Sequence, residues 1–140
     1  MPITEIDLVS WNNLQIGDRL ICSKGLFTKH HGIYAGIHDG VAWVAECQVN
    51  VGVRYLPLCE YLKWDAANLQ RIGRFTGDQS CIRSRINSVI GTPYHLLNFN
   101  CEHFAEYIQT GVVRSRQVDN AILTFGAAVL LLGAVSGRSK

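Results

Sequence analysis

The sequence predicts an α+β fold in which a small antiparallel sheet packs against helices. Segments rich in β-forming residues fill the first half of the chain, segments with helical spacing of apolar residues follow, and turn signals separate them. At 140 residues the chain is long enough for one compact domain with a buried core. We expect this domain over residues 1–118 and a hydrophobic C-terminal tail over residues 119–140.

The sheet is expected to come from five short segments of β-forming residues. In chain order these are 21–22, after a turn at Gly17-Asp18 and before a loop at 23–25, then 27–37, 41–48, 51–55 and 69–75. The residues His38-Asp39-Gly40 are a hairpin signal between the second and third segments. A short helical stretch is expected over residues 58–64, directly after Pro57.

Two longer helices are expected in the second half of the chain. The first begins at Asp78 and ends at Gly91, and its apolar face comprises Cys81, Ile82, Ile86, Val89 and Ile90. The second follows Asn100, whose side-chain oxygen can accept hydrogen bonds from amides of the first turn, and it ends at Gly111 in the C′ position. Its apolar stripe comprises Cys101, Phe104, Ala105 and Ile108.

Cys101 lies where a thiol can become reactive. In the first turn of a helix, the positive end of the macrodipole favours the thiolate, which is the nucleophilic form. A nucleophilic cysteine also needs a base and a group that orients the base. His30 and His31 lie on the second predicted strand, where alternation sends one ring to each face of the sheet. The alternative is that Cys101 is a small core residue of an amphipathic helix.

Composition excludes several classes of protein. The net charge of +2 is too small to indicate a nucleic-acid partner, and the N-terminus MPITEIDLVSW lacks the basic and apolar regions of a secretory signal. The five cysteines form no Cys-x-x-Cys pair, so neither a disulfide framework nor a zinc site is indicated. We therefore expect a reduced, cytoplasmic location.

Residues 121–135 form an uncharged stretch, AILTFGAAVLLLGAV, near the C-terminus. Spanning a bilayer takes roughly 20 apolar residues, so this stretch lies close to the threshold. Two alternatives stay open: the tail associates with a membrane, or it forms a helix that packs on the domain or on a second subunit as a homodimer. The first alternative extends the location to a membrane surface.

Two blocks of sequence resemble the lecithin:retinol acyltransferase-like family. They are His30-His31-Gly32-Ile33-Tyr34-Ala35-Gly36 and Tyr94-His95-Leu96-Leu97-Asn98-Phe99-Asn100-Cys101-Glu102-His103-Phe104. The resemblance covers roughly residues 14–118, and the ending over 110–118 resembles bacterial members. It implies a permuted papain-like fold with Cys101 as the nucleophile and His30 as the base. His31 occupies a position that other members fill with tryptophan, tyrosine or histidine.

The third member of the site departs from the family pattern. Many members carry a second histidine on the strand after the hairpin, where this chain has Val41-Ala42-Trp43 or the nearby 45–48. A three-residue hairpin loop would place Gln48 opposite His30 and Glu46 diagonally on the same face, whereas a four-residue loop would place Cys47 there. We favour Glu46 over Gln48, because a carboxylate both fixes the imidazole tautomer and stabilises the imidazolium.

The resemblance implies a thiol-dependent acyltransferase or hydrolase that forms a cysteine acyl-enzyme on phospholipid or other acyl-ester substrates. Such chemistry requires no metal and no organic cofactor. The alternatives are a cysteine peptidase or amidase of the same superfamily, or an inactive module that binds a membrane or a partner. We expect Cys101, His30 and Glu46 to be catalytic, with Gln48, Tyr34 and Asn100 in supporting or substrate-binding positions.

Overall fold

The computed structural model describes residues 13–24, 28–115 and 118–120. The elements are β1 (Arg19–Lys24), β2 (Thr28–His38), β3 (Val41–Gln48), β4 (Gly52–Pro57), α2 (Leu58–Tyr61), the 3₁₀ turn η2 (Ala66–Asn68), β5 (Leu69–Gly73), α3 (Ser80–Val89) and α4 (Cys101–Thr110). All strand pairs are antiparallel, in the order β4-β3-β2-β1-β5. The predicted α+β fold is confirmed, and β2 is the central strand.

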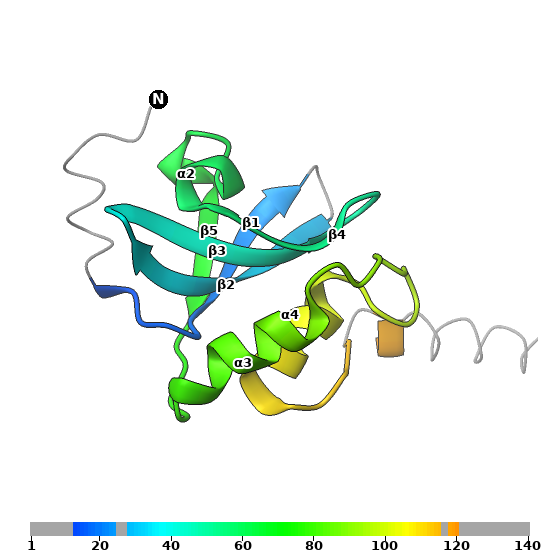
Figure 1. Ribbon diagram of the computed structural model, residues 1–140. Coiled ribbons are helices and arrows are strands. Elements are labelled where there is room, and N and C mark those ends of the chain that lie inside the picture. The colour runs from blue at the N-terminus through cyan, green and yellow to red at the C-terminus, as the bar shows by residue number, and fades with distance from the viewer. Residues whose placement is uncertain (1–12, 25–27, 116–117, 121–140) are drawn as a thin grey trace, which may run out of the picture.

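The sheet is covered on both faces. Helices α3 and α4 lie on one face and α2 on the other (Figure 1). The first face buries a cluster that includes Ile33, Val53, Ile82, Ile86, Phe104 and Ile108. The second face buries a cluster that includes Leu20, Tyr34, Val44, Leu56, Leu58 and Leu62. Removal of these apolar side chains from water stabilises the three-layer arrangement and holds α4 against β2 and β3.

The hairpin between β2 and β3 differs from both predicted loops. Only Asp39 and Gly40 form the turn, with φ of 50° and 74°, so that His38 pairs with Val41. A register shift between Tyr34 and Gly36 then inserts one extra residue in β2, and beyond this bulge Gly32 pairs with Glu46. The three-residue loop was thus wrong, yet the bulge restores the register that it implied near the start of β2. The four-residue alternative was also wrong.

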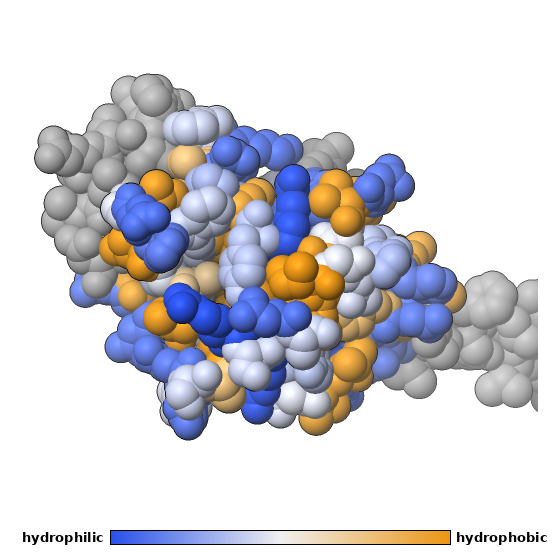
Figure 2. Space-filling model, in the orientation of Figure 1, coloured by the Kyte–Doolittle hydropathy of each residue, from blue (hydrophilic) through white to orange (hydrophobic). Residues whose placement is uncertain are grey.

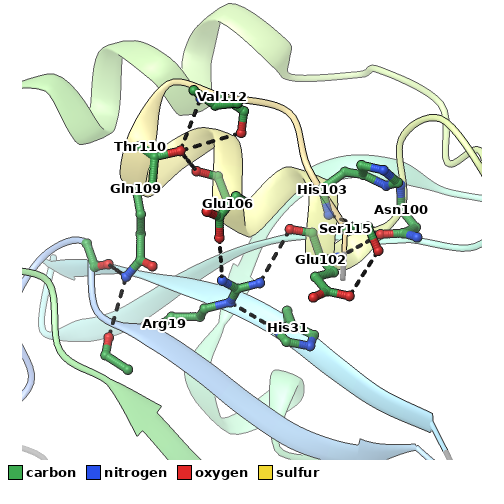
Figure 3. Close-up of polar contacts among 12 residues, drawn as sticks. Arg19, His31, Asn100, Glu102, His103, Glu106, Gln109, Thr110, Val112 and Ser115 are labelled. Atoms are coloured by element: carbon green, nitrogen blue, oxygen red, sulfur yellow. Dashed lines mark hydrogen bonds and ion pairs between the residues drawn. The ribbon is translucent and has the colours of Figure 1, made fainter. Parts of the chain in front are cut away.

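Helix α4 begins and ends where predicted. The Asn100 side-chain oxygen accepts hydrogen bonds from the amides of Glu102 and His103, both at 3.0 Å. The Asn100 amide donates to His103 Nδ1 at 3.2 Å, which completes a capping box that the sequence pattern had not indicated (Figure 3). Gly111 adopts the left-handed conformation with φ of 79°. The cap therefore fixes the direction of the chain immediately before Cys101.

Other predicted boundaries need correction. Helix α3 ends at Val89, and Ile90, with ψ of 133°, is 46% exposed instead of lying on the apolar face. The amide of Gly91 donates to the Val53 carbonyl at 3.0 Å, so the chain leaves the helix to reach β4. At the other boundary, Lys24 pairs with Thr28 and belongs to β1 rather than to a loop.

The predicted tail at 121–135 lies outside the described residues, as does most of the segment 119–140. Within the part of the chain that the structure describes, no helix is long and apolar enough to cross a membrane. Both alternatives for the tail stay predictions.

Candidate active site

Cys101 is the first residue of α4 and meets the first residues of β2. Its thiol is half-buried, and Sγ lies 3.8 Å from the backbone oxygen of Lys29. The imidazole of His30 is also close enough to the thiol to lower its pKa. The capped helix start and the central strand thus bring together two residues that are 71 positions apart in sequence.

His30 lies between the thiol and a carboxylate. Its Nε2 is 2.5 Å from Glu46 Oε2, and both side chains are buried. A carboxylate accepts hydrogen bonds, so Nε2 is the ring nitrogen that carries the proton, and Nδ1 is left for the thiol. The Tyr61 ring lies beside the imidazole with ring centres 5.5 Å apart, and its hydroxyl donates to the His30 carbonyl at 2.9 Å. These contacts hold both the ring and the strand.

Glu46 is held in turn by Arg54 of β4. The guanidinium approaches Glu46 Oε1 through Nε at 3.0 Å and through a terminal nitrogen at 2.9 Å, while the other carboxylate oxygen faces His30. Arg54 was missed by the sequence reasoning. The signal that could have identified Arg54 is cross-strand pairing, because Arg54 lies directly opposite Glu46 in the β3–β4 ladder. Reading that signal requires the register of β4.

The three groups stabilise one another's charged forms. Burial acts to raise the pKa of the Cys101 thiol, but its hydrogen bond with His30 and the nearby imidazole charge outweigh burial and lower this pKa. Burial likewise opposes the imidazolium, yet contacts with Cys101 and Glu46 raise the pKa of His30. The pKa of Glu46 is lowered by His30 and Arg54 despite burial. The arrangement favours a thiolate–imidazolium pair beside a carboxylate.

The other cysteines and the second histidine have different surroundings. Burial raises the pKa of Cys22, and it raises the pKa of Cys47 to about 12. Burial and the charge of Arg19 lower the pKa of His31 to about 4. Cys47, which a four-residue loop would have placed beside His30, instead packs in the cluster beneath α3 and α4. Of Cys22, Cys47 and Cys101, it is Cys101 whose thiol pKa is lowered.

A cleft of about 440 Å³ opens over the thiol, and it is lined by Cys101, His30, Gln48 and Asn100 among others. Gln48 also lies beside His30 in the lining, and it accepts a hydrogen bond from Lys24. Asn100 caps the helix and donates to the Leu96 carbonyl at 3.0 Å. Tyr34 packs in the buried cluster beside α2, away from this cleft.

Fold and site together define a small α+β protein in which the histidine strand precedes the cysteine helix in the chain. The family model of lecithin retinol acyltransferase matches residues 12–114, and the chain belongs to this family. A stretch of 57 residues, 39% of the chain, is 44% identical to human "Phospholipase A and acyltransferase 2" and covers 35% of that protein.

Proposed function

We propose that this protein is a thiol-dependent acyltransferase or hydrolase that carries the acyl group on Cys101. The observation that carries the proposal is the continuous contact from the Cys101 thiol through His30 to Glu46, with the pKa of the thiol lowered and that of the imidazole raised. A lowered thiol pKa is the property that a nucleophilic cysteine requires near neutral pH. Membership of the lecithin retinol acyltransferase family supports acyl transfer as the reaction class.

Acylation begins with the thiolate–imidazolium pair. The Cys101 sulfur attacks the carbonyl carbon of an ester and forms a carbon–sulfur bond. As the tetrahedral intermediate collapses, the bond to the leaving alcohol breaks and His30 gives its Nδ1 proton to that oxygen. The products are a thioester, a free alcohol and a neutral imidazole. Glu46 keeps the ring oriented and stabilises its charged form before the transfer.

Deacylation reverses these roles. The neutral imidazole of His30 removes a proton from an alcohol, an amine or water, and the resulting nucleophile attacks the thioester carbonyl. The carbon–sulfur bond breaks, and the site returns to thiolate and imidazolium. Transfer and hydrolysis thus differ only in the acceptor that reaches the thioester. The chemistry uses the side chains of this chain and needs no metal or organic cofactor.

The oxyanion of each tetrahedral intermediate needs hydrogen-bond donors close to the sulfur. The amides of Glu102 and His103 donate to Asn100, and the amide of Phe104 donates to the Asn100 carbonyl. The amide of Cys101 is the remaining donor of the first turn, where helix amides have no partner within the helix. We assign this amide to the oxyanion.

The direct test is covalent labelling of the thiol. After incubation with a short-chain phospholipid, the peptide that contains Cys101 is expected to gain the mass of one acyl group, measured by mass spectrometry. Cys101→Ser removes the adduct, whereas Cys59→Ser, which changes another partly exposed thiol, retains it. A panel of esters, amides and peptides separates ester from amide preference. Absence of both adduct and acyl release across this panel would overturn the proposal.

A second test concerns location. The proposal that the tail at 121–135 keeps the enzyme near a lipid substrate predicts weaker partitioning into detergent for a chain that ends at Asn120. Equal partitioning of the two chains would remove the tail from this role.

A further inference from the structure

The cleft above Cys101 has two kinds of wall. Leu96 and Leu97, from the loop between α3 and α4, and Val49, which follows β3, are exposed by 67%, 56% and 48% although each is apolar. Lys24 at the end of β1 and Lys29 near the start of β2 also line the cleft. Figure 1 shows that these strand ends, the β3–β4 turn and the loop lie at the same end of the molecule. The cleft therefore opens at an end of the molecule where apolar and positively charged side chains lie together.

The apolar side is held in place by the fold. His95 and Phe99 exchange two backbone hydrogen bonds of 2.8 and 2.9 Å, which close the loop around Leu96 and Leu97. Asn100 braces the same loop through the Leu96 carbonyl. Figure 2 shows that hydrophobic side chains on the face in view are broken up by hydrophilic ones, so apolar exposure is distributed in small patches. Two adjacent leucines presented beside a reactive thiol are suited to an apolar ligand.

The other side of the cleft is positively charged. Among the described residues that line the cleft, none is acidic. Glu46 lies behind His30, and its two oxygens face His30 and Arg54 instead of the cleft. Lys24 donates one hydrogen bond to Gln48, but an ammonium group has three donors and can also bind a ligand. An anion that enters the cleft thus meets cations, and among the described residues that line the cleft no carboxylate competes with it. Lys29 also lines a neighbouring hollow with Glu102 and Glu106, so the absence of acidic lining residues holds for the cleft and not for that hollow.

From these two walls we infer the substrate class: an anionic phospholipid, with its phosphate at Lys24 and Lys29 and its acyl chain along Leu96 and Leu97. This inference rests on the proposed function, because it names the acyl donor for Cys101. One molecule of this class can contact both walls at once, because its charged headgroup and its apolar chain extend in different directions from the ester that the thiol attacks. A headgroup with net negative charge gains from both lysines, whereas a zwitterionic one carries its own cation into the same positive region.

The headgroup test compares kcat/KM on vesicles of phosphatidylglycerol and of phosphatidylcholine, measured with the full chain. The wild type is expected to prefer phosphatidylglycerol, and Lys24→Gln and Lys29→Gln are each expected to lower the ratio of the two values by about fivefold, which is the contribution of one lysine near an anionic surface. Lys63→Gln, which removes an exposed lysine that does not line the cleft, is the matched control and keeps the ratio. Salt added to the buffer should also lower the ratio for the wild type.

The chain test compares substrates of one headgroup with long and short acyl chains. Leu96→Ser with Leu97→Ser is expected to lower the ratio of kcat/KM for long against short chains, because apolar contact along the chain is lost. Val112→Ser with Val113→Ser is the matched control, since both valines are exposed and lie outside the cleft. A ratio unchanged by the leucine substitutions would overturn the place assigned to the acyl chain.

Failure of this inference is distinguishable from failure of the proposed function. Acylation of Cys101 from short-chain phosphatidylcholine with no preference for phosphatidylglycerol would overturn the headgroup assignment and leave the proposed function standing. If no lipid acylates Cys101, the proposed function fails. Sedimentation of the Cys101→Ser protein with the two kinds of vesicle requires no acyl transfer, and it then tests whether Lys24 and Lys29 bind an anionic lipid surface. Equal binding before and after the lysine substitutions would overturn this binding role as well.

Discussion

On one side of β2 the His30 ring faces a carboxylate, and on the other side the His31 ring faces a guanidinium. The two residues are adjacent in sequence and equally buried, each with 6% of its surface exposed. Contacts with Cys101 and Glu46 nevertheless raise the pKa of His30, whereas burial and Arg19 lower the pKa of His31 to about 4. The partners, and not the depth of burial, determine which histidine can hold a proton near neutral pH.

The partners of His31 serve the fold. Arg19 donates from Nε to His31 Nδ1 at 2.9 Å, forms an ion pair with Glu106 at 3.0 Å and donates to the Glu102 carbonyl at 3.4 Å (Figure 3). This contact set ties β1 and β2 to the first two turns of α4. His31 thus supports the helix that carries Cys101, while His30 contacts the thiol itself.

Replacing each histidine in turn gives the largest contrast. His30→Ala removes the proton donor and acceptor, and we expect the rate of acyl transfer to fall by about 100- to 10,000-fold. His31→Gln, which keeps an acceptor for Arg19, is expected to stay near the wild-type rate. The measurement is kcat on a short-chain ester, with folding of both variants checked by thermal unfolding. Comparable losses in the two variants would refute the assignment of His30 as the base.

Glu46 tests what orients the His30 ring. Glu46→Gln keeps the size of the side chain but loses the charge that stabilises the imidazolium, and we expect kcat to fall by about 100-fold, at the low end of the range for proton transfer. Gln48→Ala alters the neighbouring alternative, which is hydrogen-bonded with Lys24, and should leave proton transfer largely intact. If Gln48→Ala were the more damaging change in kcat, Glu46 would not be the orienting residue.

His31 predicts how stability depends on pH. Because its pKa in the folded protein is about 4, the unfolded chain binds a proton below its ordinary pKa of 6.5 while the folded chain does not. The stability contribution is therefore lost as pH falls from 6.5 towards 4, by about 2 kcal/mol between pH 7 and pH 5. Urea unfolding at the two pH values should show this loss, and His31→Gln should lack it. An equal loss in His31→Gln would assign the pH dependence to other groups.

The sequence predicts the cysteine side of the site better than the carboxylate side. The cap at Asn100 and the start of α4 depend on neighbouring residues, so their local pattern predicted them. Placement of Glu46 beside His30 depends on a hairpin turn and a bulge together, and the local signal of the bulge after Tyr34 is a single residue, Gly36, with φ of 95°. The predicted register near His30 was therefore reached through a wrong loop length.

Long-range contacts were the hardest to predict. Arg54 lies eight residues beyond Glu46, and its role becomes visible only when β4 pairs with β3. The contacts of Arg19 with α4 join residues 87 and 83 positions apart. No periodicity or motif in the sequence encodes such distances, because they follow from the way the layers pack.

Arg54 gives the smallest expected effect and the sharpest test of what sets the charge of His30. The guanidinium is 44% exposed at its side chain, so its ion pair with Glu46 is screened by solvent and contributes about 1 kcal/mol. Arg54→Gln is therefore expected to lower kcat/KM by about fivefold. Loss of this positive charge also leaves the Glu46 carboxylate free to stabilise the imidazolium further, so the limb of the pH–rate profile that reports His30 should move to higher pH.

Arg54→Lys keeps the charge and should keep the limb in place, and Arg83→Gln on α3 is the control for a lost surface charge. A lower melting temperature for Arg54→Gln with an unshifted pH profile would instead make Arg54 a contact between β3 and β4 with no part in positioning the charge of the site.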